Sequence, residues 1–272
     1  MTRLGRISLI ILCAWGTALI LPAGALSQEI GPKPRWLPGL GLEYFSRTIS
    51  WDPDPDTNQD QYTSKLKALT GQFELGCEIR PGTTVSLLIG YSLSDLSGLI
   101  FRQLPISIDY EAGSIGGFEW GAGFDQSLIT FGYFEIKALA QFVMYFGPAK
   151  NFEVTDLNVD GKLEAQPNYW MRAQVGPSLV YRGFEYFSPF LSVAFNKLWG
   201  KFTVTETVGD LAGTEEKKIS GKSVIGIALG TTFESSPNFS LTAQGTLLPF
   251  SRGANQGLGL DVGATLKAVI SF

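Results

Sequence analysis

The 272-residue sequence contains no histidine. Histidine is the side chain that most often serves as a general base near neutral pH, so its absence excludes hydrolases that depend on a Ser–His or Asp–His pair. The nucleophile-elbow motif Gly-x-Ser-x-Gly does not occur either. A Ser–Lys arrangement is not excluded by composition. We therefore expect no enzymatic activity, no catalytic residue and no cofactor.

Cysteine and charge are scarce as well. Cys13 falls in an N-terminal leader, so Cys77 would be alone in the mature chain and no intramolecular disulfide could form. Charged residues make up 17% of the chain without a marked run of Lys and Arg, which argues against a nucleic-acid partner. The 32 glycines and the 12% of aromatic residues are typical of a chain of strands and turns.

Residues 1–27 have the features of a cleaved secretory signal peptide. Arg3 and Arg6 precede an apolar run at 7–21, and small residues follow at 23–27. The apolar run is shorter than the roughly 20 residues that a membrane-spanning helix needs, which disfavours an uncleaved anchor. Three prolines then mark 28–38 as an irregular lead-in to the folded domain.

The last stretch of the sequence, 257–272, alternates between two chemically different sets of residues. A period of two over such a length describes a β-strand with one apolar and one mostly small or polar face. The stretch is longer than the usual strand of about 5–6 residues, and its last residue is aromatic. The apolar set is Leu258, Leu260, Val262, Ala264, Leu266, Ala268, Ile270 and Phe272.

This stretch resembles the closing strand of bacterial outer-membrane β-barrels, in which alternate hydrophobic residues and a terminal Phe form the insertion signal read by the barrel assembly machinery. The resemblance implies an integral protein of the bacterial outer membrane that arrives through the periplasm. Its partners would be outer-membrane lipid and, during biogenesis, the assembly machinery. The residues that match the assembly signal are Leu266, Ala268, Ile270 and Phe272.

Residues 39–272 divide into ten strand-like segments. Short turns near Pro81, Asp125, Gly183 and Pro237 alternate with longer polar loops, the asymmetry expected of a transmembrane barrel. The sequence therefore predicts an all-β, membrane-spanning, antiparallel up-and-down β-barrel of ten strands, with eight or twelve as alternatives. The predicted strands are 40–51, 66–79, 84–93, 117–124, 128–146, 168–181, 187–204, 223–233, 239–250 and 257–272. The predicted loops are 52–64, 94–116, 147–167, 208–220 and 251–256.

A secreted soluble β-sandwich or lipocalin-like barrel is an alternative, because its strands alternate too. The polar face is rich in Gly, Ser and Thr with isolated charges, whereas the loops hold charge in clusters, which favours lipid outside and a mixed polar lumen. Aromatic residues near the strand ends would form interfacial girdles. These are Trp51, Phe146, Tyr169, Trp199 and Phe250 at the outer end, and Phe187, Phe233, Phe239 and Phe272 at the inner end.

Eight polar residues share the inward phase of the predicted strands, and we expect them to line the lumen. They would form either an interior ion-pair network that fills the barrel or the lining of a narrow passage. Small barrels are usually just filled by side chains, whereas aqueous channels need about 16 strands. The predicted lumen residues are Glu74, Glu119, Glu135, Lys137, Gln141, Arg172, Gln174 and Lys267.

The acidic stretch 52–60 spaces its carboxylates like a calcium-binding loop. Thr57 and Thr63, however, occupy the positions that need Gly and a bidentate Glu. We expect a solvated loop there and no metal site.

Two functional classes fit these observations. The first is a structural or surface-interaction role, in which extracellular loops contact envelope components or an unidentified external ligand. The second is a narrow porin-like channel for small solutes. The lack of histidine disfavours a third class, outer-membrane hydrolases. The strand pattern is shared by barrels of many functions and does not decide between them.

Overall fold

The computed structural model describes residues 34–51, 62–105, 108–110, 113–153, 161–166, 168–251 and 258–272. These residues belong to one compact unit, Pro34–Phe272. The expected signal peptide, 1–27, and the acidic stretch 52–60 lie outside the described residues. Among the described residues there is no helix long and apolar enough to cross a membrane.

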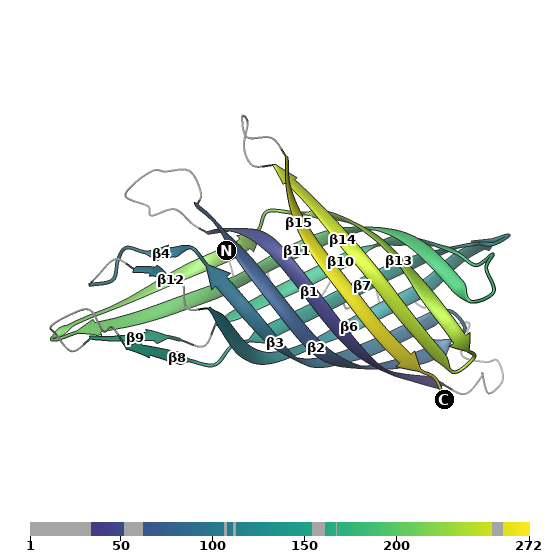
Figure 1. Cartoon of the computed structure of the whole chain (residues 1–272), viewed down its shortest axis with the longest axis horizontal. Helices are drawn as coiled ribbons and strands as arrows, with labels where there is room; N and C mark the ends of the chain where they lie inside the picture. The colour runs from purple at the N-terminus through teal and green to yellow at the C-terminus, as the bar shows by residue number, and fades with distance from the viewer. Residues whose placement is uncertain are drawn as a thin grey trace, which may run out of the picture. The chain divides into compact units, whose positions relative to one another are not determined.

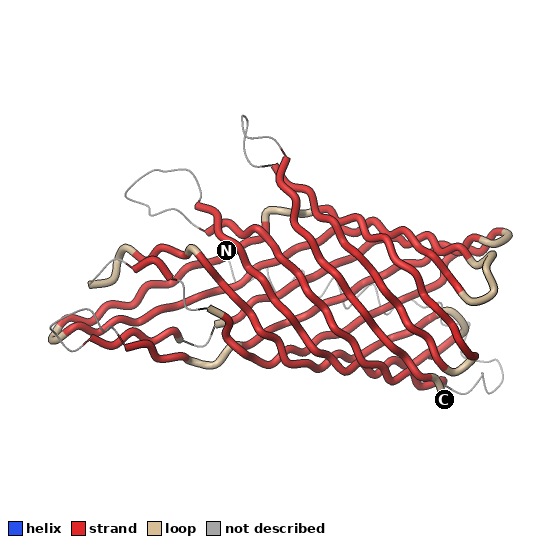
Figure 2. Tube along the Cα trace, viewed as in Figure 1, coloured by secondary structure: helices blue, strands red, loops and turns tan. Residues whose placement is uncertain are grey.

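Ten antiparallel strands close into a barrel, which confirms the predicted strand number (Figures 1 and 2). Each ring strand pairs with the ring strands next to it in sequence, and the last pairs with the first, so the ring has no open edge. The ring strands are β1 (Arg35–Trp51), β2 (Tyr62–Arg80), β3 (Thr83–Ser97), β6 (Ser114–Phe131), β7 (Phe134–Phe146), β10 (Tyr169–Tyr181), β11 (Phe187–Val208), β13 (Ile225–Ser236), β14 (Phe239–Ser251) and β15 (Leu258–Ile270).

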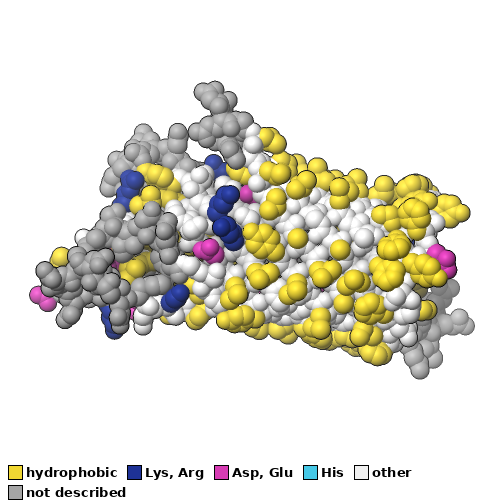
Figure 3. All heavy atoms as spheres, viewed as in Figure 1, with side chains coloured by type: hydrophobic (Ala, Val, Ile, Leu, Met, Phe, Trp, Pro, Cys, Tyr) yellow, Lys and Arg dark blue, Asp and Glu magenta, His cyan; other side chains and the backbone are white. Residues whose placement is uncertain are grey.

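Apolar side chains cover the outside of the ring, the reverse of a soluble protein. In β15 the outward Leu260 is 53% exposed, whereas its inward neighbour Asp261 is 3% exposed. Hydrophobic side chains are spread over the visible barrel wall, and charged side chains gather towards its ends (Figure 3). Such a belt is the surface of a membrane-spanning barrel, which rules out the soluble β-sandwich alternative.

Shorter strands extend the wall beyond the ring at one end, here called the long-loop end; the opposite end, with the tight turns, is the short-turn end. In the described residues, the predicted loops 94–116, 147–167 and 208–220 thus contain regular β-structure. The added strands are β4 (Leu99–Phe101) paired with β5 (Ile108–Tyr110), β8 (Lys150–Glu153) paired with β9 (Gly161–Ala165), and β12 (Leu211–Gly221), which pairs with β11 and β1.

Two of the predicted connections are wrong. Residues 208–220 were expected to form a loop because of their charges, but Glu215 and Lys217 form a buried ion pair on the inward face of β12. The expected turn near Asp125 does not exist, because β6 continues to Phe131. The chain turns instead at Gly132, whose φ of +57° is a conformation that glycine adopts without strain.

The barrel wall also begins earlier than expected. β1 starts at Arg35, so residues 35–38 are part of the wall and not of the lead-in. Trp36 pairs with Cys77 of β2, and Pro38 pairs with Leu75. Proline is compatible with a strand near its first residue, where fewer ladder hydrogen bonds are required.

The wall narrows from ten strands to eight along its length. At the short-turn end β1 pairs with β15, as far as Ser46. From Ile49 onward the same edge of β1 pairs with β12. One edge of β11 pairs with β13 nearer the short-turn end and with β12 nearer the long-loop end. At the long-loop end β12 therefore stands in the ring in place of β13, β14 and β15. The β14–β15 hairpin diverges from the wall at this point (Figure 1).

The two faces of β7 provide a stability test. Ala140 lies on the outward face beside Phe124, and Gln141 points inward and is hydrogen-bonded to Gln174 at 3.0 Å. Ala140→Arg should reduce the free energy of unfolding by about 2–4 kcal/mol, the cost of an arginine near the bilayer midplane, and Gln141→Arg by much less. Urea unfolding in lipid vesicles measures both. Equal losses would mean that the faces are assigned wrongly.

Candidate functional site: the closed barrel interior

An apolar cluster fills the interior at the long-loop end. Every strand of the eight-strand ring contributes at least one buried hydrophobic side chain to it, so the cluster extends across the whole cross-section. Its largest fully buried members are Trp170, Tyr145, Phe101, Phe202, Ile49, Leu66, Leu99 and Leu198.

Two aromatic residues show how tightly this cluster is built. Trp170 stacks on Tyr145 with ring centroids 5.3 Å apart and meets Phe45 edge-on at 5.2 Å. Its indole N–H donates to Ser94 Oγ at 3.1 Å, and the Tyr145 hydroxyl donates to the Ile115 carbonyl at 2.9 Å. Both polar atoms are therefore satisfied inside an apolar core, as buried Trp and Tyr require.

Trp51 belongs to the same cluster, so its predicted place in the outer aromatic girdle is wrong. Its side chain points inward and is 3% exposed. The ring stacks on Tyr62 at 4.7 Å, and its indole N–H donates to Ser64 Oγ at 2.9 Å. The girdle prediction used only the position of Trp51 near a strand end. It did not consider that Trp51 lies on the inward phase of β1.

A segment between β3 and β6, residues 98–105, closes the mouth and is called the stopper. No strand of the barrel sheet pairs with it, yet Leu99 and Phe101 are completely buried in the apolar cluster. The Gly98 carbonyl accepts a hydrogen bond from Ser64 Oγ at 2.6 Å, and the Gln103 N–H donates to Glu215 at 2.8 Å. The stopper is thus held by apolar burial and by hydrogen bonds at both of its ends.

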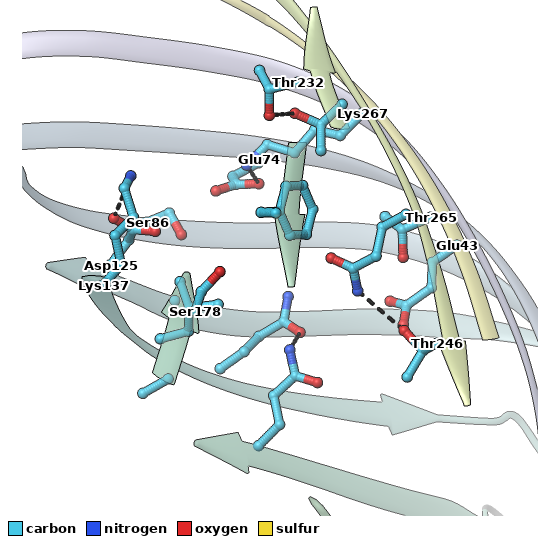
Figure 4. A pocket seen from close by; sticks show the side chains of 18 of the residues that line it. Glu43, Glu74, Ser86, Asp125, Lys137, Ser178, Thr232, Thr246, Thr265 and Lys267 are labelled. Carbon is cyan, nitrogen blue, oxygen red and sulfur yellow. Dashed lines mark hydrogen bonds and ion pairs between the residues drawn. The ribbon is translucent and has the colours of Figure 1, made fainter. Parts of the chain in front are cut away.

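A polar cavity of about 470 Å³ occupies the other half of the interior (Figure 4). It ends against Phe45 of the apolar cluster, over whose ring the Arg172 guanidinium lies at 5.1 Å. At the short-turn end it is lined by Arg182 and Glu234, whose side chains are 43% and 47% exposed, so it opens there. The cavity is therefore open at one end and closed at the other.

Most of the predicted lumen residues lie together on the wall of this cavity. Glu119 and Glu135 do not line it and are buried beside it, where Glu119 accepts from Thr70 at 3.1 Å and Glu135 pairs with Arg182 at 2.8 Å. The predicted residues that do line it are Glu74, Lys137, Gln141, Arg172, Gln174 and Lys267.

The charges in the cavity form cross-strand ion pairs. Lys267 reaches Glu74 at 2.6 Å, and Lys137 reaches Asp125 at 3.1 Å; both pairs are drawn in Figure 4. Arg172 donates to Glu43 at 2.7 Å. Since each cation faces a carboxylate, the lining presents little net field to a charged solute.

Asp261, which was not singled out from the sequence, lies at the point where the wall narrows. Its Oδ1 accepts from both the backbone N–H and the hydroxyl of Thr48 at 2.8 Å, and its Oδ2 accepts from the Ser223 hydroxyl. Arg47 lies 3.8 Å away and donates to the Ser223 carbonyl at 2.8 Å. The inward phase of Asp261 was visible in the sequence, but the residues that surround it come from distant strands.

The residues that match the assembly signal lie at the short-turn end on β15 and just after it. Leu266 and Ile270 are outward and exposed, and Phe272 is 79% exposed. The Phe272 N–H donates to the Trp36 carbonyl at 3.1 Å, which ties the chain end to the start of β1.

No protein-family model matches the sequence, and no curated protein does. The outer membrane protease OmpT from Escherichia coli is similar in structure, with 10% identity over 90% of this chain and 97% of that chain and a TM-score of 0.48. The translocator domain of the autotransporter NalP from Neisseria meningitidis has 9% identity, coverages of 98% and 97%, and a TM-score of 0.46. The attachment invasion locus protein Ail of Yersinia pestis has 12% identity, coverages of 89% and 100%, and a TM-score of 0.32. These likenesses concern barrel architecture alone.

Removal of the Asp261 carboxylate should destabilise the barrel strongly. Asp261→Ala leaves the Thr48 N–H without its acceptor and Arg47 without its buried counter-charge, a loss of about 3–5 kcal/mol in the free energy of unfolding. Asp125→Ala is the matched control, because the side chain of Asp125 is 35% exposed, and it should cost about 1 kcal/mol or less. Urea unfolding in vesicles compares the two, and similar losses would contradict a special role for Asp261.

Proposed function

We propose that this protein is a non-enzymatic barrel of the bacterial outer membrane that has a closed lumen and acts through its long-loop end. In this proposal the short-turn end faces the periplasm, and the β-extension is an interaction surface outside the cell. The observation that carries the proposal is the apolar cluster, which seals the interior with side chains from all eight strands and from the stopper.

The extension has the character of a folded platform. β8, β9 and β12 continue the barrel sheet, and Leu163, Ala165 and Ile219 are buried in the same apolar cluster as the barrel residues. A platform that shares its core with the membrane-embedded wall is held in a fixed orientation. This supports a surface that a partner can recognise without first ordering a loop.

The outward face of the β11–β12 hairpin suits contact with a partner in water. Thr214, Glu216 and Lys218 are exposed along β12, and Leu211 at the hairpin tip is 65% exposed. Alternating polar side chains with one exposed leucine differ from the apolar belt of the wall, which faces lipid. We assign the interaction role to this hairpin first.

A narrow channel is the second candidate, and the polar cavity is the observation that favours it. A solute could enter the cavity at the short-turn end, but a conducting path would have to cross the apolar cluster. Conduction would therefore require the stopper to leave the mouth.

Planar-bilayer conductance tests the closed lumen. Refolded wild-type protein should show no steady openings, whereas a variant with residues 99–110 replaced by a Gly-Ser linker should conduct, because the stopper no longer fills the mouth. Leu211→Ser, at the exposed tip, is the control and should remain silent. Steady wild-type openings would overturn the closed lumen in favour of the channel, and a folded but silent linker variant would show that the stopper is not the seal.

Cysteine labelling on intact cells tests the orientation. Asp210→Cys, beside Gly209 in the β11–β12 turn, should react with a membrane-impermeant maleimide. Asn238→Cys, exposed in the tight turn between β13 and β14, should react only after the outer membrane is permeabilised. Wild-type protein, with Cys77 alone in the mature chain, gives the background. The reverse labelling pattern would contradict an extracellular platform.

A further inference from the structure

A shallow apolar groove lies on the lipid-facing side of the wall, where β2, β1, β15 and β14 run side by side. One row across these strands places Leu69, Tyr44, Ala264 and Gly245 opposite one another. The small residues form the floor of the groove, and Leu69 and Tyr44 form its side; its volume is about 470 Å³. A Cβ added at Gly245 would meet no atom within 4 Å, so the space over the floor is open there.

The wall changes from apolar to charged directly beyond the groove, towards the long-loop end. The next outward row brings Val262, Ser46 and Lys67 opposite one another, and Asp95 of β3 follows Lys67 on the side away from the groove. Since neighbouring strands lie about 4.8 Å apart, the backbones of Lys67 and Val262 are separated by about 10 Å. In the following row Lys65 lies opposite Thr48 on β2 and β1.

The backbone of a third lysine lies at the same level on the other side of β1. Lys222 follows β12, and its backbone N–H donates to the Thr48 carbonyl at 3.0 Å. Lys65 and Lys67 are exposed, and none of the three lysines forms an ion pair within the described part of the chain. Figure 3 shows basic side chains at this boundary of the hydrophobic belt, with acidic side chains beside them.

We propose that the groove and the three lysines form one binding site for an acylated, phosphorylated lipid of the surrounding leaflet. An acyl chain lies in the groove over Ala264 and Gly245, and the phosphate lies among Lys65, Lys67 and Lys222. The inference rests on the proposed orientation, in which the long-loop end faces outward, but it is independent of what that end binds.

The order of the apolar groove and the lysines along the wall favours a lipid over other occupants. In a leaflet the acyl chain points to the bilayer centre and the phosphate lies at the boundary, and the site repeats this order from groove to lysines. Lysines near a membrane surface are attracted to anionic lipid headgroups. A soluble phosphate would use the lysines but gain nothing from the groove, and a neutral lipid would use only the groove.

Native mass spectrometry of the refolded protein in neutral detergent, titrated with diphosphorylated lipid A, tests the site. The variant Lys65→Gln/Lys67→Gln/Lys222→Gln should bind on the order of 100-fold more weakly, as expected for the loss of three surface attractions. Gly245→Leu fills the groove without changing charge, and it should also weaken binding. The hollow at Gly245 accommodates the added side chain, so this variant keeps the test valid if the triple variant folds poorly.

Two controls have matched chemistry elsewhere on the wall. Arg80→Gln removes an exposed cation at the short-turn end, and Ala140→Leu enlarges an outward residue of β7; both should bind as the wild type does. Unchanged binding by both the triple variant and Gly245→Leu would overturn the site. Equal binding of dephosphorylated lipid A would overturn the role of the lysines, and full competition by inorganic phosphate would reduce the site to a simple anion site.

Discussion

A backbone amide in a lipid-embedded wall has to find its hydrogen-bond partner within the protein, because hydrocarbon offers none. This constraint is hardest to meet where the ring narrows and β1 leaves β15. Asp261 meets it by accepting the Thr48 N–H at 2.8 Å, and Lys222 by donating to the Thr48 carbonyl at 3.0 Å. On the other side the Asn196 N–H donates to the Val224 carbonyl at 2.6 Å. With these groups paired, β12 can enter the ring and the β14–β15 hairpin can leave it.

The narrowing also decides how the interior is used. In the eight-strand part, inward side chains from non-neighbouring strands meet inside the ring, as Trp170 of β10 meets Phe45 of β1 at 5.2 Å, and exclude water. In the ten-strand part the inward residues are smaller or carry paired charges, so a hollow remains between Arg172 and the short-turn end. The sealed eight-strand part and the hollow ten-strand part therefore both result from one change in strand number. A closed lumen agrees with the proposed role at the outer surface better than with transport.

The period-two alternation made the barrel, its strand number and its inward phase predictable, because the pleat is a local property of each strand. Predictions failed where pairing between distant segments decides the outcome. β12 looked like a charged loop because the partners that bury Glu215 and Lys217 lie elsewhere in the chain. Asp125 looked like a turn residue, although it lies within β6 and pairs with Lys137 of the neighbouring strand β7 at 3.1 Å. The apolar groove is formed by four strands in register, so the sequence of any one strand does not predict it.

The loss of two strands from the ring makes this barrel a funnel. The diameter of a closed sheet grows roughly in proportion to its strand number, so the eight-strand mouth has about four-fifths of the width of the ten-strand base. A tapered tube can be sealed at its narrow end by a few large side chains, while the wide end stays hydrated and keeps its charges solvated. In such a design the aperture is governed by where β12 joins the ring, and a shift of that junction along β1 would lengthen or shorten the seal without adding a strand.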